Sequence, residues 1–231
     1  WTAFAMNRTN TAYPGPAADP SGDWINDLAL DPAGRLWVGA SAYATAKPGW
    51  VVDGVSVYTG DVTGDVAGDV GWTNYTPDNG LVSDYVTALA VDAAGRTWVG
   101  TRGGLGLFDG ERWTSFSAAD GLPSLYVTDV AADDQGGVWV TTWGGGAAYY
   151  DGETWRYLTT QRLADREVNA LAEDHDGAIW LATTGGVSRC DGDEWTVYTE
   201  RDGLADNDSR AVVVDGAGSV WVGGGSGKFE G

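Results

Sequence analysis

Few residues of this chain are of the types that carry out covalent catalysis. Histidine occurs once, as His175, and cysteine once, as Cys190. Ser-His-Asp triads, Cys-His pairs and multi-histidine metal sites all need a histidine beside their other groups, and His175 falls in an expected turn with two aspartates. Hydrolysis of a glycosidic bond needs only two carboxylates, about 5–9.5 Å apart, and Glu167 and Asp208 are the one plausible pair. We therefore predict that the protein is not an enzyme.

Aromatic side chains are the more abundant binding groups, with 13 Trp and 10 Tyr. Exposed aromatic rings stack on sugars and attract cations. Ten of the Trp, however, recur at two fixed positions, so we expect them to pack between sheets as large apolar groups. One set is Trp37, Trp98, Trp139, Trp180 and Trp221, and the other is Trp1, Trp72, Trp113, Trp155 and Trp195.

The first set of Trp residues ends a motif, Asp-x-x-Gly-x-x-Trp, that occurs five times. The copies lie at 31–37, 92–98, 133–139, 174–180 and 215–221. Successive Trp residues are 61, 41, 41 and 41 positions apart, and insertions within 41–54 and 59–71 account for the longer first gap. A period of this length predicts a repeat architecture.

Each repeat predicts four short strands. In the second unit an almost continuous apolar run at 85–91 indicates a strand buried on both faces. Strands at 97–101, 105–108 and 112–117 follow it, joined by Asp-x-x-Gly and Asp-Gly turns in which Gly adopts positive φ. Four antiparallel strands repeated radially describe an all-β fold, a five-bladed β-propeller.

The ends of the chain complement each other. The segment 228–231, "KFEG", is the first half of a motif found whole at 108–116, and the chain begins with "WTAF", its second half. We predict that the N-terminal strand at 1–5 pairs with the blade of 205–231, which closes the ring and removes exposed sheet edges. Residues 1–231 then form one domain, expected to be a monomer.

The segment "VTALAVDAAGRTWVGTRGGLGLFDG" (86–110) and its copies resemble the two-component regulator propeller repeat. This resemblance covers nearly the whole chain outside the insertions. It implies a bacterial, extracytoplasmic (periplasmic or secreted), sensor-type propeller that binds a ligand, often a glycan fragment.

Three Trp residues stand outside the repeat: Trp24, Trp50 and Trp143. In an up-and-down blade, the loops between second and third strands and the links between blades share one face, so all three are expected there. At the position of Trp24 the other units carry Tyr85, Tyr126, Glu167 and Asp208. Aromatics beside carboxylates at a channel mouth suit an oligosaccharide or a cationic amphiphile. The alternatives are that these aromatics only plug the channel, or that the long loop with Trp50 docks a protein partner.

Two positions further along, every inner strand carries a polar residue. These are Asn26, Thr87, Thr128, Asn169 and Arg210. Buried polar groups need a partner, so we expect them to line a water-filled channel. The cation Arg210 is placed to receive an anion or to pair with Glu167 or Asp208.

The formal charge of −20 argues against a nucleic-acid partner, which would need a basic stripe on the surface. More than half of the acidic residues fall in predicted hairpin turns, where Asp is favoured. Asp61, Asp65 and Asp69 repeat every four residues in a Gly-rich loop. They suggest a weak calcium site, although a solvated hairpin extension is the preferred interpretation, and we expect no cofactor. No apolar run reaches the ~18 residues of a membrane span.

Overall fold

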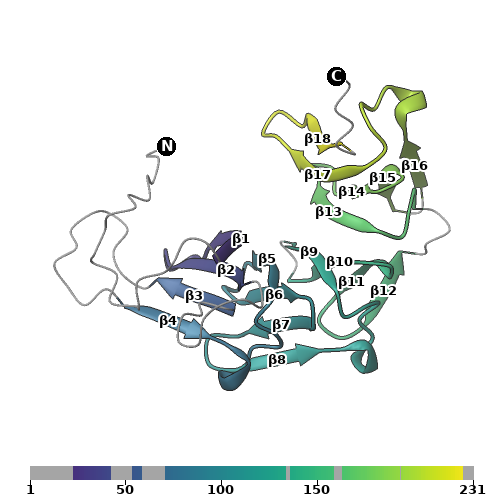
Figure 1. The fold of residues 1–231 in the computed structure, drawn as a ribbon. Coiled ribbons are helices and arrows are strands. Elements are labelled where there is room, and N and C mark those ends of the chain that lie inside the picture. The colour runs from purple at the N-terminus through teal and green to yellow at the C-terminus, as the bar shows by residue number, and fades with distance from the viewer. Residues whose placement is uncertain are drawn as a thin grey trace.

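The computed structural model describes residues 23–42, 54–58, 71–133, 136–158, 163–192 and 194–225. They form eighteen strands in five antiparallel sheets, which follow one another around an arc (Figure 1). The inner strand of each sheet faces the centre of the arc, and the fourth strand lies at the periphery. The predicted all-β propeller fold, with one sheet per repeat, is thereby confirmed.

The first four sheets have four strands each. The first contains β1 (Asp23–Leu30), β2 (Leu36–Ala42), β3 (Gly54–Tyr58) and β4 (Trp72–Tyr75). The second contains β5 (Val86–Val91), β6 (Thr97–Thr101), β7 (Gly104–Phe108) and β8 (Trp113–Phe116). The third contains β9 (Val127–Ala132), β10 (Val138–Thr142), β11 (Gly146–Tyr150) and β12 (Trp155–Leu158). The fourth contains β13 (Val168–Glu173), β14 (Ile179–Thr183), β15 (Gly186–Asp191) and β16 (Glu194–Tyr198).

The links between sheets contain short 3-10 helices that the sequence reasoning did not predict. They are η1 (Pro77–Asn79), η2 (Ala118–Asp120) and η3 (Glu200–Asp202). Each begins after a Thr or Ser and ends at a Gly with positive φ, for example Ser117 and Gly121 (φ 102°) around η2. The Ser117 side chain and the Asp120 carboxylate satisfy backbone N–H groups at the start of η2, as in a capping box. The links therefore turn the chain sharply into the next inner strand.

The fifth sheet has two described strands, β17 (Ser209–Val214) and β18 (Val220–Gly224). Trp221 of β18 is 63% exposed, whereas its counterpart Trp37 is 1% exposed. On the first sheet, Leu28 and Leu30 are likewise exposed. The N-terminal strand predicted at 1–5, and the pairing that would close the ring, lie outside the described residues, so closure stays a prediction.

The core lies between neighbouring sheets. Trp37 of the first sheet packs with Val86, Leu89 and Phe108 of the second, and its ring centroid is 5.7 Å from that of Phe108. Similar clusters join the second sheet to the third and the third to the fourth. Small residues at the middle of the second strand permit this approach: a Cβ on Gly100 would lie 2.7 Å from the side chain of Val127. The Gly of Trp-Val-Gly-Thr is therefore needed for close packing.

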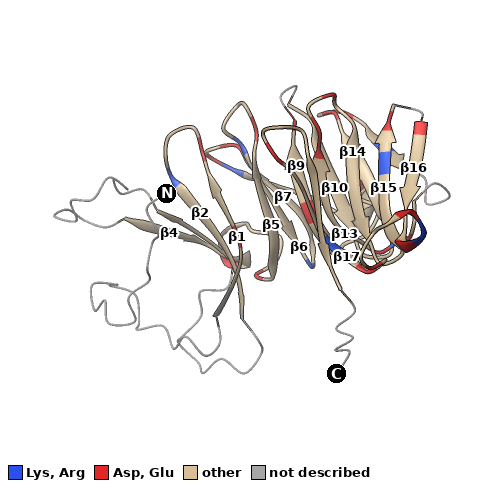
Figure 2. Cartoon of the chain, turned by 90° about the horizontal axis from the view of Figure 1, so that it is seen from above, with Lys and Arg blue, Asp and Glu red and all other residues tan. Residues whose placement is uncertain are grey.

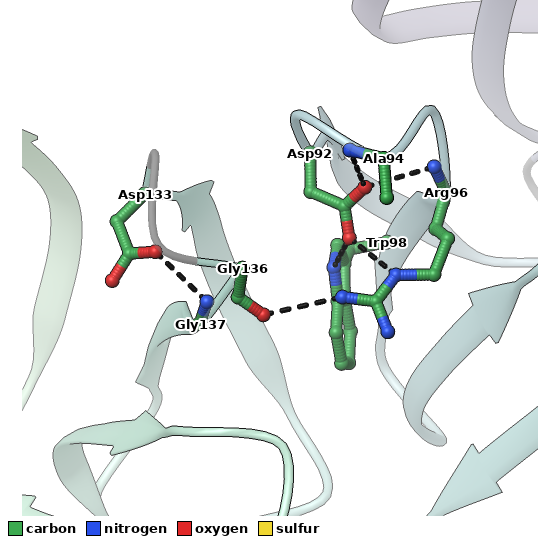
Figure 3. Close-up of polar contacts among 7 residues, drawn as sticks. All are labelled: Asp92, Ala94, Arg96, Trp98, Asp133, Gly136 and Gly137. Atoms are coloured by element: carbon green, nitrogen blue, oxygen red, sulfur yellow. Dashed lines mark hydrogen bonds and ion pairs between the residues drawn. The ribbon is translucent and has the colours of Figure 1, made fainter.

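The Asp of the repeated motif ties its turn to the Trp (Figure 3). Asp92 is 2% exposed, and its Oδ1 accepts hydrogen bonds from the backbone N–H groups of Ala94 (3.0 Å) and Arg96 (2.9 Å). Its Oδ2 accepts from Nε of Arg96 at 2.6 Å and from the indole Nε1 of Trp98 at 3.2 Å. Arg96 also donates to the carbonyl of Gly136 in the next sheet at 3.2 Å. One carboxylate thus fixes the turn, the core Trp and, through Arg96, the neighbouring sheet.

The carboxylate–indole bond recurs in three other sheets. The distances from the indole nitrogen to the carboxylate are 3.0 Å for Asp31–Trp37, 2.9 Å for Asp174–Trp180 and 2.8 Å for Asp215–Trp221. Burial raises the pKa of Asp31, but the hydrogen bonds from Trp37 and Arg35 outweigh it, so the pKa lies below its ordinary value. The recurrence explains why Asp and Trp are six positions apart in four of the five repeats. In the third sheet, Asp133 instead accepts from the hydroxyl of Tyr149 at 2.6 Å.

Acidic residues gather in the loops at the ends of the strands (Figure 2). Asp109 and Asp151, for example, each accept two backbone N–H groups of their own turn. Much of the negative charge therefore serves turn geometry.

Candidate functional site

In four of the five sheets, two residues lie side by side at one end of the axis. The first is the residue at the entry to the inner strand, and the second is the residue that follows the second strand. The backbone N–H of the second donates to the carbonyl of the first in all four pairs that the structure describes. These are Arg102 to Tyr85 (3.1 Å), Trp143 to Tyr126 (2.9 Å), Thr184 to Glu167 (3.2 Å) and Gly225 to Asp208 (2.9 Å). We call these residues the mouth pairs.

Short polar side chains hold the first member of each mouth pair. The N–H of Tyr85 donates to Oγ of Ser83 at 3.2 Å, and that of Tyr126 to Oγ of Ser124 at 3.4 Å. In the fourth and fifth sheets the acceptors are aspartates two residues earlier, Asp165 for Glu167 and Asp206 for Asp208. These local turns fix the backbone whatever side chain the mouth residue carries.

A buried threonine holds the second member. Thr101, at the end of β6, is fully buried; its hydroxyl donates to the carbonyl of Gly104 at 2.7 Å and accepts the N–H of Gly103 at 3.0 Å. Thr142 and Thr183 make the equivalent bond to Gly146 and Gly186. The turn that presents Arg102, Trp143 or Thr184 is therefore built from the same parts in three sheets.

Below the mouth pairs, every inner strand contains a β-bulge, because one residue is skipped in its pairing with the second strand. The skipped residues are Asn26, Thr87, Thr128, Asn169 and Arg210. They are the polar residues that the sequence predicted to line the channel. We call them the bulge ring.

Four members of the bulge ring donate to a backbone carbonyl of the next inner strand. The bonds run from Asn26 to Val86 (2.6 Å), Thr87 to Val127 (2.8 Å), Thr128 to Val168 (2.6 Å) and Asn169 to Ser209 (2.8 Å). The fifth member, Arg210, pairs with Asp208 at 2.8 Å. The donors of the first four residues are thus satisfied by the neighbouring strand and join the sheets. That the ring lines a water-filled channel stays a prediction.

A hollow of about 310 Å³ opens at the mouth. Its lining comprises Asn26, Tyr85, Thr87, Arg102, Tyr126, Thr128, Trp143 and Asn169. Members of the bulge ring form part of the lining, and the mouth pairs of the second and third sheets form the rest. Three of the predicted aromatic residues, Tyr85, Tyr126 and Trp143, thus lie around one hollow.

The side chains of these two mouth pairs form a continuous stack. The guanidinium carbon of Arg102 lies 3.5 Å from the ring centroid of Tyr85 and 4.9 Å from that of Tyr126. Tyr126 in turn stacks on Trp143, with centroids 6.1 Å apart and ring planes 25° apart. Trp143 is 44% exposed. This arrangement offers a flat aromatic surface beside a cation.

The other predicted site residues are placed as follows. Trp24 lies in β1, paired in register with Ser41, and Trp50 lies outside the described residues. Glu167 and Asp208 occupy mouth positions of the fourth and fifth sheets but are not among the residues that line the hollow. Asp208 is engaged by Arg210, which raises the pKa of the Arg210 guanidinium.

Arg102 was missed by the sequence reasoning, although the signal was present. It occupies the repeat position of Trp143, directly after the second strand, in "TWVGTR" against "VWVTTW". The sequence reasoning selected residues by aromatic type and left Arg102 in a generic Gly-rich loop. Comparison of the repeats at this position alone would have identified it.

Two carboxylates occupy the inner strands below the hollow. Asp27 accepts the N–H of Leu89 at 2.7 Å, and Asp129 accepts the N–H of Leu171 at 2.9 Å, so each joins its strand to the next sheet. Burial raises the pKa of Asp129 to about 7, and the negative charge of Asp27 adds to that rise, against the lowering effect of the two backbone N–H groups that Asp129 accepts. Asp129 is therefore a titratable group near neutral pH at the joint between the third and fourth sheets.

Asp61, Asp65 and Asp69, the suggested calcium ligands, lie outside the described residues. Within the described ranges, no three His, Cys, Asp or Glu side chains gather to hold a metal ion. Cys190 is buried, as expected from its place in the third strand. The part of the chain that the structure describes has no helix of the length and apolarity that a membrane crossing requires.

Comparison with known proteins places the repeat. Residues 80–103, 121–144 and 162–185 match the family model described as the two component regulator propeller, which confirms the resemblance inferred from the repeat. Each matched segment contains one complete mouth pair. No curated protein sequence matches the chain.

Solved structures show the same fold. The chain is similar to the extracellular domain of the putative hybrid two component system BT3049 from B. thetaiotaomicron, with a TM-score of 0.69 and 21% identity over 87% of this chain and 26% of that one. For the corresponding domain of BT4673 the TM-score is 0.70 and the identity 16%, over 89% of this chain and 29% of that one. This chain therefore spans less than a third of those two.

An enzyme is also among the similar structures. It is a catalytically inactive virginiamycin B lyase from Staphylococcus aureus with quinupristin, with a TM-score of 0.61 and 11% identity over 88% of this chain and 64% of that one. At these identities the three likenesses establish the propeller fold alone.

Proposed function

We propose that this chain of two-component regulator propeller repeats is a non-catalytic binding module of the sensor type, which takes a small ligand at the axial hollow. The observation that carries the proposal is the stack of Tyr85, Arg102, Tyr126 and Trp143 around one hollow of about 310 Å³. An exposed Trp beside polar side chains suits a ligand that has both an apolar face and polar groups, as a sugar has.

The construction of the mouth supports a binding role. Ser83, Ser124, Thr101 and Thr142 fix the backbone at both positions of the two mouth pairs, and the side chains differ from sheet to sheet. A site of this kind varies its ligand contacts without altering the fold.

Sensing outside the cytoplasm is the second part of the proposal. Its support is the repeat itself and the similarity to two structures described as extracellular domains of two component systems. Because one of the similar structures is a lyase, catalysis is the alternative function. In this chain the single histidine, His175, lies in the turn that follows β13, at the end of that strand opposite to Glu167, and it does not line the hollow.

Titration calorimetry against a panel of neutral and acidic oligosaccharides tests the proposal. We expect one or more to bind wild type and to lose about five-fold in affinity in Trp143→Ala, since stacking on one ring contributes on the order of 1 kcal/mol. Tyr157→Ala is the matched control, because Tyr157 is 54% exposed on the outer strand β12, away from the hollow.

Two outcomes would contradict the proposal. The first is a panel without a binder, alongside a protein partner captured by wild type and by Trp143→Ala alike, which would favour an interaction scaffold. The second is turnover of a bound oligosaccharide, detected as new products by mass spectrometry, which would make the protein an enzyme.

A further inference from the structure

The hollow contains a cation that has no acidic partner in the part of the chain that the structure describes. There, the arginines that pair with a carboxylate within 4.0 Å are Arg35, Arg96, Arg156, Arg189 and Arg210. Arg102 instead lies over the rings of Tyr85 and Tyr126, and its side chain is exposed. A guanidinium held by its flat face keeps its N–H edge directed away from the rings, and that edge matches a carboxylate in a two-point bond.

The floor of the hollow offers acceptors. Asn26 and Asn169 each donate through Nδ2 to a backbone carbonyl, so Oδ1 of each amide is left as an acceptor on a lining residue. Thr87 also donates its proton to a carbonyl, which leaves the oxygen lone pairs. Because the donors of the floor already bond the neighbouring strand, its free acceptors favour a ligand that carries hydrogen-bond donors, such as hydroxyl groups.

The third feature is the apolar wall. Trp143 is 44% exposed and stacks on Tyr126, so the ring face that it presents is fixed by a neighbour. The axial C–H groups of a pyranose suit such a face, and so do other flat apolar groups.

From these three features we infer that the ligand of the hollow is an acidic sugar, a polyhydroxylated ring that carries a carboxylate. Its carboxylate binds the guanidinium of Arg102, its hydroxyls donate to the bulge ring and one ring face stacks on Trp143. The inference rests on the proposed function, because it names the chemical class bound at that same hollow.

The carboxylates nearest the floor of the hollow are Asp27 and Asp129. Each accepts a backbone N–H of the next sheet, and burial raises the pKa of Asp129 to about 7, which reduces its negative charge near neutral pH.

The repeated turns with Asp92 and Asp174 lie at the far ends of the inner strands, about six residues or roughly 20 Å away along the strand. That distance exceeds twice the ~8 Å over which charges are screened at physiological ionic strength. Glu167 and Asp208 lie at the mouth itself, in the fourth and fifth sheets, and Asp208 is paired with Arg210. They favour an orientation in which the carboxylate points to Arg102 and the hydroxyls point to Glu167.

The test compares trigalacturonate with its fully methyl-esterified form, which keeps every ring and hydroxyl and removes the charge. Calorimetry on wild type is expected to show binding of the acid at least ten-fold tighter than the ester, with a difference that shrinks as NaCl rises from 20 to 500 mM, as screening predicts. Arg102→Gln is expected to abolish the difference between the two forms. Arg112→Gln is the matched control, because Arg112 is exposed in the turn between β7 and β8 at the other end of the strands.

The outcomes separate the two proposals. Equal binding of acid and ester, or a preference for the acid that persists in Arg102→Gln, would overturn the acidic-sugar inference and leave the binding module in place. Neutral sugars that bind in a Trp143-dependent way while trigalacturonate does not bind would overturn it in the same manner. Failure of the whole panel would remove the proposed function and this inference together.

Discussion

Replacement of Asp92 by Ala tests how the repeated motif holds the sheets together. Asp92 is 2% exposed and accepts four hydrogen bonds, from two backbone N–H groups, Nε of Arg96 and the indole of Trp98. Without it, the indole N–H of Trp98, whose residue is 1% exposed, has no acceptor, which costs about 1–3 kcal/mol. The two turn N–H groups and the Arg96 guanidinium, whose side chain is 33% exposed, also lose an acceptor, at about 0.5–1.5 kcal/mol for each bond.

We therefore expect Asp92→Ala, which loses four hydrogen bonds and leaves one buried donor unsatisfied, to lower the free energy of unfolding by about 3–5 kcal/mol. For a domain of this size about 2–4 °C of melting temperature is lost per kcal/mol, or roughly 6–20 °C altogether. Thermal unfolding followed by circular dichroism measures the shift. Asp92→Asn should fall between the two proteins, because the amide oxygen can still accept the turn N–H groups while the amide nitrogen cannot accept from Trp98.

Asp109→Ala is the control for this series. Asp109 occupies the other type of hairpin and accepts only two backbone N–H groups, from Glu111 and Arg112, at an exposed turn. Its replacement should shift the melting temperature far less than Asp92→Ala. Equal shifts for the two variants would refute the idea that the carboxylate–indole bond, rather than turn chemistry in general, is what the repeat conserves at this position.

Three further predictions concern the joints between sheets. Thr87→Val should lower the free energy of unfolding by about 1 kcal/mol, since it removes the bond to the carbonyl of Val127; Thr87→Ser should not, and identical urea midpoints for the two variants would contradict this. Protonated Asp129 should contribute stability that is full below about pH 4 and is lost as the pH rises to about 7, because the native state keeps a proton that the unfolded chain has released. Urea midpoints at pH 5 and pH 8 should therefore differ less in Asp129→Ala than in wild type. An equal difference in the two proteins would argue against this contribution. Deletion of residues 1–5 should lower the melting temperature well beyond the effect of trimming a frayed terminus, and an unchanged melting temperature would refute ring closure.

The fold was predictable because each repeat encodes one sheet, and its Trp and Gly residues recur at the positions where neighbouring sheets pack together. Trp37 and Trp98 are core residues at 1% exposure each, as their shared position indicated. The Asp that precedes each of them proved to be its hydrogen-bond acceptor, whereas the sequence reasoning had assigned it to turn chemistry alone. A pattern of six-residue spacing shows that two residues go together, but it does not show which atoms meet.

The bulge ring shows a second limit of the sequence. A polar residue at the middle of each inner strand was visible, and so was its cost if unpaired. The bulge that turns Thr87 or Asn169 toward the next sheet could not be predicted from the sequence. A strand of six residues reads the same in sequence whether or not one residue is skipped in its pairing. The partner is a backbone carbonyl 40 residues away, which no local pattern specifies.

The same two sets of residues explain how one repeat can carry a site without weakening the fold. The atoms that join the sheets are the bulge-ring donors and the backbone carbonyls, and the atoms that fix the mouth backbone belong to Ser83, Thr101 and their counterparts. Neither set includes the side chain of a mouth residue. The same backbone position therefore carries different side chains in different sheets, namely Tyr85, Tyr126, Glu167 and Asp208. The chemistry of the hollow depends on which of these side chains line it. Because Arg102 and Trp143 come from adjacent sheets, exchange of these two residues should leave the melting temperature unchanged. If the hollow binds an acidic sugar as we infer, the exchanged protein should still prefer trigalacturonate to its methyl ester in calorimetry, since the guanidinium is moved by one sheet and not removed.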